Sequence, residues 1–198
     1  MNVKLVRLFG WFGIITPVVG FSLIFLAIST APWFSWQTNA LSDLGVEGLT
    51  AAIFNRGLMM TAAVTAVSAL GIYELGKGDR LGKVGFITLI WACIFLVGIG
   101  WFPETAGRIH REVSIAFFVT LPVAMILITV SFIRRGHRKL GALGIVSGAV
   151  AIAVWTLSWD GVAIPEAVSA ASAGVWSIVT GAWMTRYVEQ DRVDDLTG

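Results

Sequence analysis

Six apolar stretches, each long enough to cross a bilayer as a helix, dominate this chain of 198 residues. They cover residues 8–31, 49–75, 84–102, 112–133, 140–159 and 165–187. A transmembrane α-helix needs about 20 mostly apolar residues, whereas a strand of a membrane β-barrel needs about ten residues of alternating polarity. The continuous runs therefore predict an all-α polytopic membrane protein, a bundle of six transmembrane helices.

The composition supports this fold class. Hydrophobic residues make up 57% of the chain and charged residues 13%, which is about half the charged share of a soluble domain. We expect one transmembrane domain, residues 1–188, followed by a polar cytoplasmic tail, residues 189–198. The net charge of +2 does not indicate nucleic-acid binding, because the basic residues cluster at the edges of the spans.

The lysine and arginine residues predict how the spans are oriented. If the N-terminus is cytoplasmic, all but three of the 14 Lys and Arg residues lie on the cytoplasmic side, the exceptions being Arg56, Arg108 and Arg111. Cytoplasmic segments of membrane proteins are enriched in these residue types. Since the number of spans is even, we expect a multi-pass protein of the cell membrane with both termini in the cytoplasm.

Polar residues gather on the side that this orientation places outside the cell. They are Ser42 and Asp43 in NALSDLG, Asn55 and Arg56 in IFNRGLMM, Glu104 and His110 in GIGWFPETAGRIH, Arg108 and Arg111 around that histidine, and Asp160 and Glu166 in the last outer loop. Loops on one side of a bundle lie close together. We therefore expect a ligand-binding site made of Ser42, Asp43, Asn55, Arg56, Glu104 and His110.

Arg56 is expected about 8–9 Å inside the second span, where an unpaired charge is costly. The guanidinium must extend toward the interface or pair with a carboxylate, for which Asp43, Glu104 and Glu112 are the candidates. Two interpretations fit this position. One is a structural salt bridge that pins the first loop to the second span, and the other is an anion site for a lipid phosphate or another headgroup.

The stretch GIGWFPETAGRIH joins the third and fourth spans. Pro103 predicts the end of a helix and Gly107 a tight turn, so Glu104 and His110 should face each other across a short loop. Such a pair could act as general acid and base, which makes these two residues the catalytic candidates. Together with Asp43 they could also hold a divalent metal, although no zinc-hydrolase signature is present. A structural helix cap is the third interpretation, and the sequence indicates no cofactor.

Three motifs together resemble a known family. They are S-D-L-G at residues 42–45, F-N-x-G-L at residues 54–58, and F-P-E at residues 102–104 with His110 downstream. From Arg7 to Arg186 the chain resembles the small archaeal and bacterial membrane proteins catalogued as domain of unknown function 998. The resemblance implies about six spans and a membrane location, and it implies no particular reaction. The chain departs from the family pattern in the last outer loop, where Ala167 instead of an arginine follows Glu166.

These observations predict a membrane module that binds a lipid or another small ligand on its extracytoplasmic face, with membrane lipids as its partners. One alternative is an enzyme that acts on a lipid headgroup through acid–base or metal-assisted chemistry. Another is a transporter or channel. The middles of five of the six spans carry no charged residue, which counts against proton or ion coupling. Whether the chain catalyses a reaction stays open at this point.

Overall fold

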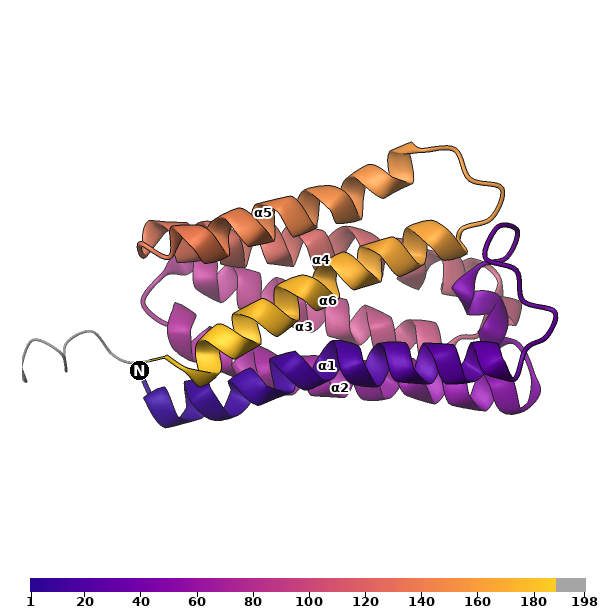
Figure 1. The fold of residues 1–198 in the computed structure, drawn as a ribbon, viewed down its shortest axis with the longest axis horizontal. Coiled ribbons are helices and arrows are strands. Elements are labelled where there is room, and N and C mark those ends of the chain that lie inside the picture. Colours follow the sequence, from indigo (N-terminus) through magenta and orange to yellow (C-terminus); the bar gives the residue numbers. More distant parts are fainter. Residues whose placement is uncertain (188–198) are drawn as a thin grey trace, which may run out of the picture.

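A computed structural model describes residues 1–187 and shows six α-helices in this part of the chain (Figure 1). They are α1 (Val3–Ser29), α2 (Gly48–Gly76), α3 (Arg80–Trp101), α4 (Arg108–Arg134), α5 (Arg138–Ala153) and α6 (Ala163–Thr185). Six helical segments, α5 being counted with the turn that follows it, are long and apolar enough to cross a membrane. The described residues contain no β-strand, so the predicted all-α six-span architecture is confirmed. The expected tail, residues 189–198, lies outside the described residues.

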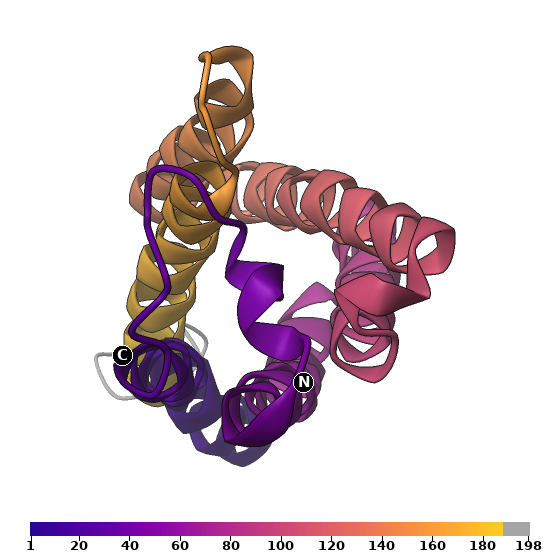
Figure 2. The same cartoon turned by 90° about the vertical axis from the view of Figure 1, so that its right-hand side faces the viewer.

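The helices form a closed ring. Each helix packs against the next one in the chain, and α6 returns to pack against α1. Figure 2 looks along the bundle and shows this order around the ring. At the end where α5 leads into α6, α5 leans away from the rest of the ring (Figures 1 and 2). This divergence positions the groove that is described below.

Glycine residues allow the closest helix contacts. A Cβ atom on Gly10 of α1 would lie 2.7 Å from the carbonyl oxygen of Gly181 on α6, and a Cβ on Gly181 would lie 2.5 Å from the Gly10 oxygen. No larger side chain fits there without moving a backbone. Helices in membranes associate largely through such close packing, because lipid tails are as apolar as the helix surfaces.

The two ends of the bundle differ in charge. One end holds the segments 30–47, 102–107 and 157–162, with the 3₁₀ turns η1 (Leu41–Gly45) and η2 (Glu104–Ala106), and we call it the η1 end. The other holds the N-terminus, the α2–α3 and α4–α5 turns and the end of α6, and we call it the basic end. Of the described Lys and Arg residues, only Arg56, Arg108 and Arg111 belong to the η1 end. This grouping follows the predicted loop pattern, whereas the cytoplasmic position of the basic end stays a prediction.

The fifth helix ends earlier than expected. The α-helical part stops at Ala153 and continues as the 3₁₀ turn η3 (Val154–Thr156), whereas the apolar run had predicted a helix to residue 159. After this turn Leu157 has an extended backbone, and the Trp159 indole N–H donates to the Val154 carbonyl over 2.8 Å. A side-chain donor therefore satisfies a carbonyl that a longer helix would have paired within its own backbone.

Candidate functional site

The segment 30–47 crosses the η1 end of the ring and is tied to α6 (Figure 2). The N–H of Leu41 donates to Oε2 of Glu166 over 2.7 Å in a buried contact. The N–H of Ala163 donates to the carbonyl of Asn39 over 2.9 Å. These two bonds fix η1, which carries Ser42 and Asp43, above the interior of the bundle.

The Asp43 carboxylate accepts hydrogen bonds from the residues just before it in the chain. Its Oδ2 atom accepts from Nδ2 of Asn39 over 2.7 Å and from the N–H of Ala40 over 2.9 Å. Burial alone would raise the pKa of Asp43, but hydrogen bonds from Glu104, Ala40 and Asn39 hold it below its ordinary value. Asp43 therefore stays ionised and acts as the acceptor of this group.

Glu104 forms a carboxyl pair with Asp43 across the η1–η2 contact. The hydrogen bond with Asp43, then burial, then the negative charge of Asp43 raise the pKa of Glu104 to about 7, although the Ser42 hydroxyl also donates to this carboxyl. Two carboxylates this close cannot both ionise easily, so they share one proton. The protonated Glu104 donates to Asp43, and the pair changes its charge near neutral pH.

His110 lies buried at the start of α4, close to the carboxyl pair but outside its hydrogen bonds. Its Nδ1 atom lies 2.7 Å from the carbonyl oxygen of Phe102, and its Nε2 atom lies 3.4 Å from Oγ of Ser114. Because a carbonyl can only accept, Nδ1 carries a proton and donates to Phe102. The expected pairing of His110 with Glu104 is therefore replaced by these two contacts.

Asn55 and Arg56 are placed differently, although they are neighbours in α2. Asn55 donates from Nδ2 to the carbonyl of Gly45 over 2.9 Å, which ties the end of η1 to α2. The Arg56 side chain is exposed and lines neither the groove nor the central cavity described below. Among the described residues it forms no ion pair, and Glu112, one of its expected partners, pairs with Arg108 over 2.6 Å.

A groove of about 1040 Å³ opens beside these residues, between α4, α5 and α6. Glu104, Arg108, His110 and Arg111 line its polar part, and Trp155 of η3 lies in its wall. Much of the remaining lining is apolar and includes Ile115, Val119 and Val123 of α4 and Ile152 of α5. The groove thus brings a polar mouth and an apolar wall into one continuous surface.

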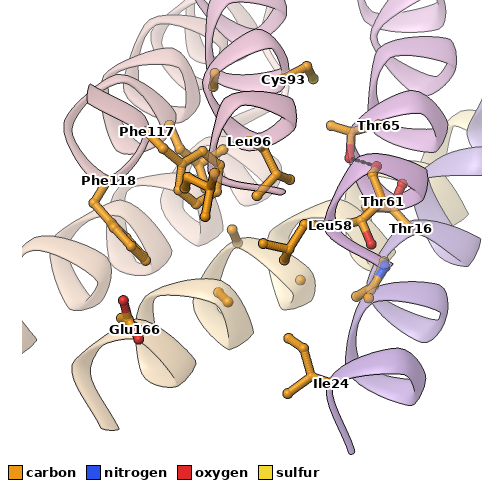
Figure 3. Close-up of a pocket in the computed structure, with 18 of the residues that line it drawn as sticks. Thr16, Ile24, Leu58, Thr61, Thr65, Cys93, Leu96, Phe117, Phe118 and Glu166 are labelled. Carbon is orange, nitrogen blue, oxygen red and sulfur yellow. Dashed lines mark hydrogen bonds between the residues drawn. The ribbon is translucent and has the colours of Figure 1, made fainter. Parts of the chain in front are cut away.

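A second cavity, of about 150 Å³, lies in the centre of the ring (Figure 3). Its wall is almost entirely apolar and comes from α1, α2, α3, α4 and α6. The groove and this central cavity share Ser42, Ser114, Phe118 and Glu166. We call these four residues the threshold, because they are the common boundary of the two spaces.

Three of the threshold residues, Ser114, Phe118 and Glu166, were not among the expected site residues. Glu166 is only 9% exposed and anchors the segment 30–47 through its bond with Leu41. A carboxylate that directly follows Pro165 inside the first turn of a span was the available signal. Ser114 follows His110 by four residues on α4, a spacing that places two side chains on one helix face.

The possible metal site finds no support in the geometry. Among the described residues, no three His, Cys, Asp or Glu side chains are grouped so that they could hold a metal ion. Of the proposed ligands, Asp43 and Glu104 bond to each other, and His110 directs Nδ1 to a backbone carbonyl. The carboxyl pair is therefore better described as a proton-sharing site.

Comparison with known proteins gives one match. The family described as protein of unknown function (DUF998) matches residues 14–183, which is most of the chain. No curated protein and no solved structure matches significantly. The chain therefore belongs to the DUF998 family, as the three motifs had suggested.

Proposed function

We propose that this member of the DUF998 family binds a membrane lipid that carries a phosphate in its headgroup, in the groove at the η1 end. The observation that carries the proposal is the order of residues along α4. The groove-lining positions are polar at Arg108, His110, Arg111 and Ser114 and apolar from Ile115 to Val123. From Arg108 to Val123 the helix rises about 22 Å, which is about the depth of one bilayer leaflet with its headgroups.

The charges at the mouth of the groove favour a phosphate. Arg111 is exposed to the groove, and among the described residues it has no ion-pair partner. Arg108 beside it shares its guanidinium with Glu112, which lies outside the groove lining. A guanidinium can bind a phosphate through two parallel hydrogen bonds. Glu104 and Glu166 line the same groove and could accept from a donor elsewhere in the headgroup.

The expected orientation places this groove in the outer leaflet. The basic end would face the cytoplasm, where lysine and arginine residues are enriched. The groove opens between helices that each cross the membrane, and α5 leans outward beside it. A lipid could then enter sideways from the bilayer without leaving it.

Lipid retention in native mass spectrometry tests the proposal. The protein is released from nanodiscs that contain a phospholipid or, in a second arm, diacylglycerol with the same chains. We expect the phospholipid to be retained about tenfold more, and Arg111→Gln to remove this preference, since one charge-assisted hydrogen bond contributes about 1.5–3 kcal/mol. Competition with inorganic phosphate distinguishes a lipid headgroup from free phosphate as the ligand.

Arg56→Gln is the matched control, because Arg56 is an exposed arginine at the same end that does not line the groove. It should retain the phospholipid as the wild type does. Equal retention of the two lipids by the wild type, or equal loss in the two variants, would contradict the proposal.

A second candidate function is acid–base catalysis on the bound headgroup, with Glu104 and His110 as acid and base. It is favoured by the pKa of Glu104, about 7, at a position that lines the groove. His110 also offers Nε2 toward Ser114 at the threshold. Turnover of a phospholipid by the purified protein, abolished in His110→Asn but not in Arg56→Gln, would support this function over binding alone.

A further inference from the structure

We infer that one hydrocarbon chain of the bound lipid passes the threshold and lies in the central cavity, inside the ring of helices. This inference rests on the proposed function and adds where one chain of the lipid goes. The ligand would then be held at two places, its headgroup in the groove mouth and one of its chains within the protein.

The shape of the central cavity suits a chain. On α3 its lining runs from Leu89 to Ile99, and on α6 from Glu166 to Ser177. Each of these ranges covers about 15 Å along a helix axis. The cavity is therefore elongated along the bundle, and its volume of about 150 Å³ has room for a few methylene groups of a single chain, since an apolar cavity of about this size holds a ligand as large as benzene.

Four hydroxyls in the wall already donate to backbone carbonyls, so their protons are not available to a polar ligand. The hydroxyls of Thr16, Thr61 and Thr65 each donate to the carbonyl four residues earlier in their own helix, over 2.7–2.9 Å. Ser177 donates across to the carbonyl of Gly13 on α1 over 2.7 Å. Figure 3 shows the three threonines on the side of the cavity opposite Glu166 and Phe118.

An apolar occupant follows from this arrangement. A buried water needs about 2–4 hydrogen-bond partners, whereas apolar cavities of about 150 Å³ stay dry and accept apolar ligands. A chain that fills the cavity would give the atoms of its wall the dispersion contacts that an empty space denies them. The wall around Leu96, Cys93 and Phe117 is of this apolar kind (Figure 3).

The chain would enter the central cavity from the groove, between the threshold residues. The end of the cavity toward η1 is covered by Leu41, which is held in place by the bond from its N–H to Glu166. The shared residues lead sideways into the groove instead. There the Phe118 ring lies 5.0 Å from the Trp155 ring, measured between centroids. Rotation of these rings would admit a chain without unfolding a helix.

Photocrosslinking tests the inference directly. Nanodiscs are prepared with a phospholipid that carries a diazirine near the end of one chain, and the crosslinked peptides are mapped by mass spectrometry. We expect crosslinks to Leu89, Cys93 and Leu96, which line the cavity, in addition to the crosslinks that bulk lipid forms with the outward-facing Ile87 and Ile94 of the same helix. Crosslinks confined to outward-facing positions would overturn the inference.

A cavity-filling variant provides the second arm. Ala92 is 1% exposed and lines the cavity, so Ala92→Leu should reduce the interior crosslinks about tenfold. Ala63 lies on the exposed face of α2, and Ala63→Leu adds the same volume without entering the cavity, so it should leave them unchanged. Thermal unfolding of both variants confirms that they fold.

The outcomes separate the two proposals. If the wild type retains phospholipid in an Arg111-dependent way but yields no interior crosslinks, the chain inference is wrong and the proposed function stands. If the wild type shows no preference for phospholipid at all, the proposed function is wrong and the inference falls with it. Shorter-chain lipids should crosslink nearer to the threshold, and an unchanged pattern across chain lengths would also contradict the inference.

Discussion

The two ends of the bundle use their charged residues in different ways. At the basic end, Arg135 donates to the carbonyl of Leu75 at the end of α2, and Arg7 donates to the carbonyl of Thr185 at the end of α6 over 2.9 Å. At the η1 end the inward-facing groups are carboxyls, and they accept from backbone N–H groups or bond to each other. The cations of that end are left facing outward or into the groove.

This difference separates the charged groups that satisfy helix ends from those that remain available for the proposed ligand. The last carbonyls of a helix have no partner within it, so an arginine near a helix C-terminus satisfies a group that would otherwise be unpaired. Arg135 and Arg7 therefore stabilise the fold. Arg111 at the η1 end has no such task within the described residues, which is why it can serve binding.

The largest stability effect is expected at Glu166. This residue lines both the groove and the central cavity and accepts the hydrogen bond from Leu41 in the segment 30–47. Glu166→Ala leaves the N–H of Leu41 buried without an acceptor, so it should lower the free energy of unfolding by about 2 kcal/mol. Glu166→Gln keeps an oxygen at this position and should lose less than half as much. Thermal unfolding in detergent measures both. Equal losses in the two variants would show that the hydrogen bond to Leu41 is not what holds the segment.

Much of this architecture could be predicted from the sequence. The six spans follow from the length of the apolar runs. Because every second loop of a bundle lies on the same side, Ser42, Asp43, Glu104 and His110 come to one end. Both arguments depend only on how far a helix extends per residue and on which side of the bundle a loop lies. They need no knowledge of side-chain packing.

The details of the site depended on packing and could not be predicted in this way. Asn55 and Arg56 are adjacent, but successive residues on a helix point about 100° apart, so one reaches η1 and the other faces outward. The rotation of α2 about its axis decides which is which, and it is set by contacts with other helices. The role of Glu166 could not be predicted for the same reason, because it depends on where the distant Leu41 is held.

The next largest effect comes from comparing one arginine substitution at each end of the bundle. Arg135→Ala removes the donor to the Leu75 carbonyl, so it should lower the free energy of unfolding by about 1 kcal/mol and leave phospholipid retention unchanged. Arg111→Gln should do the opposite, with loss of retention at unchanged stability. Arg138→Ala, at an exposed arginine of the basic end, is the control and should change neither quantity. A loss of lipid retention in Arg135→Ala would contradict the division between the ends.

The smallest effect is a loss of stability as the pH rises toward neutral, which should appear at the η1 end. At the basic end, burial and then the charge of Arg135 lower the pKa of His137 below 6.5, so this residue costs stability only as the pH falls below 6.5. The pKa of Glu104 is raised from 4.5 to about 7, so its protonated form contributes stability at low pH that is lost as the pH rises through 7. The pKa values of Asp43 and, at the basic end, of Asp79 lie below 3.8, so their contributions are lost only in acid. The hydrogen bond from Ser131 is the main cause of the lowered pKa of Asp79.

Between about pH 5.5 and 8.5 we therefore expect the melting temperature to fall by about 2–4 °C, because Glu104 is exposed and solvent screens its repulsion with Asp43. Hydrogen exchange should increase over the same range in residues 40–45 and not in the α2–α3 turn. Glu104→Gln cannot ionise and should abolish both changes, whereas Asp79→Asn should leave them intact. If the melting temperature of Glu104→Gln still fell at high pH, the shared proton of Asp43 and Glu104 would not be the cause. Another titratable group in the groove would then account for the pH dependence.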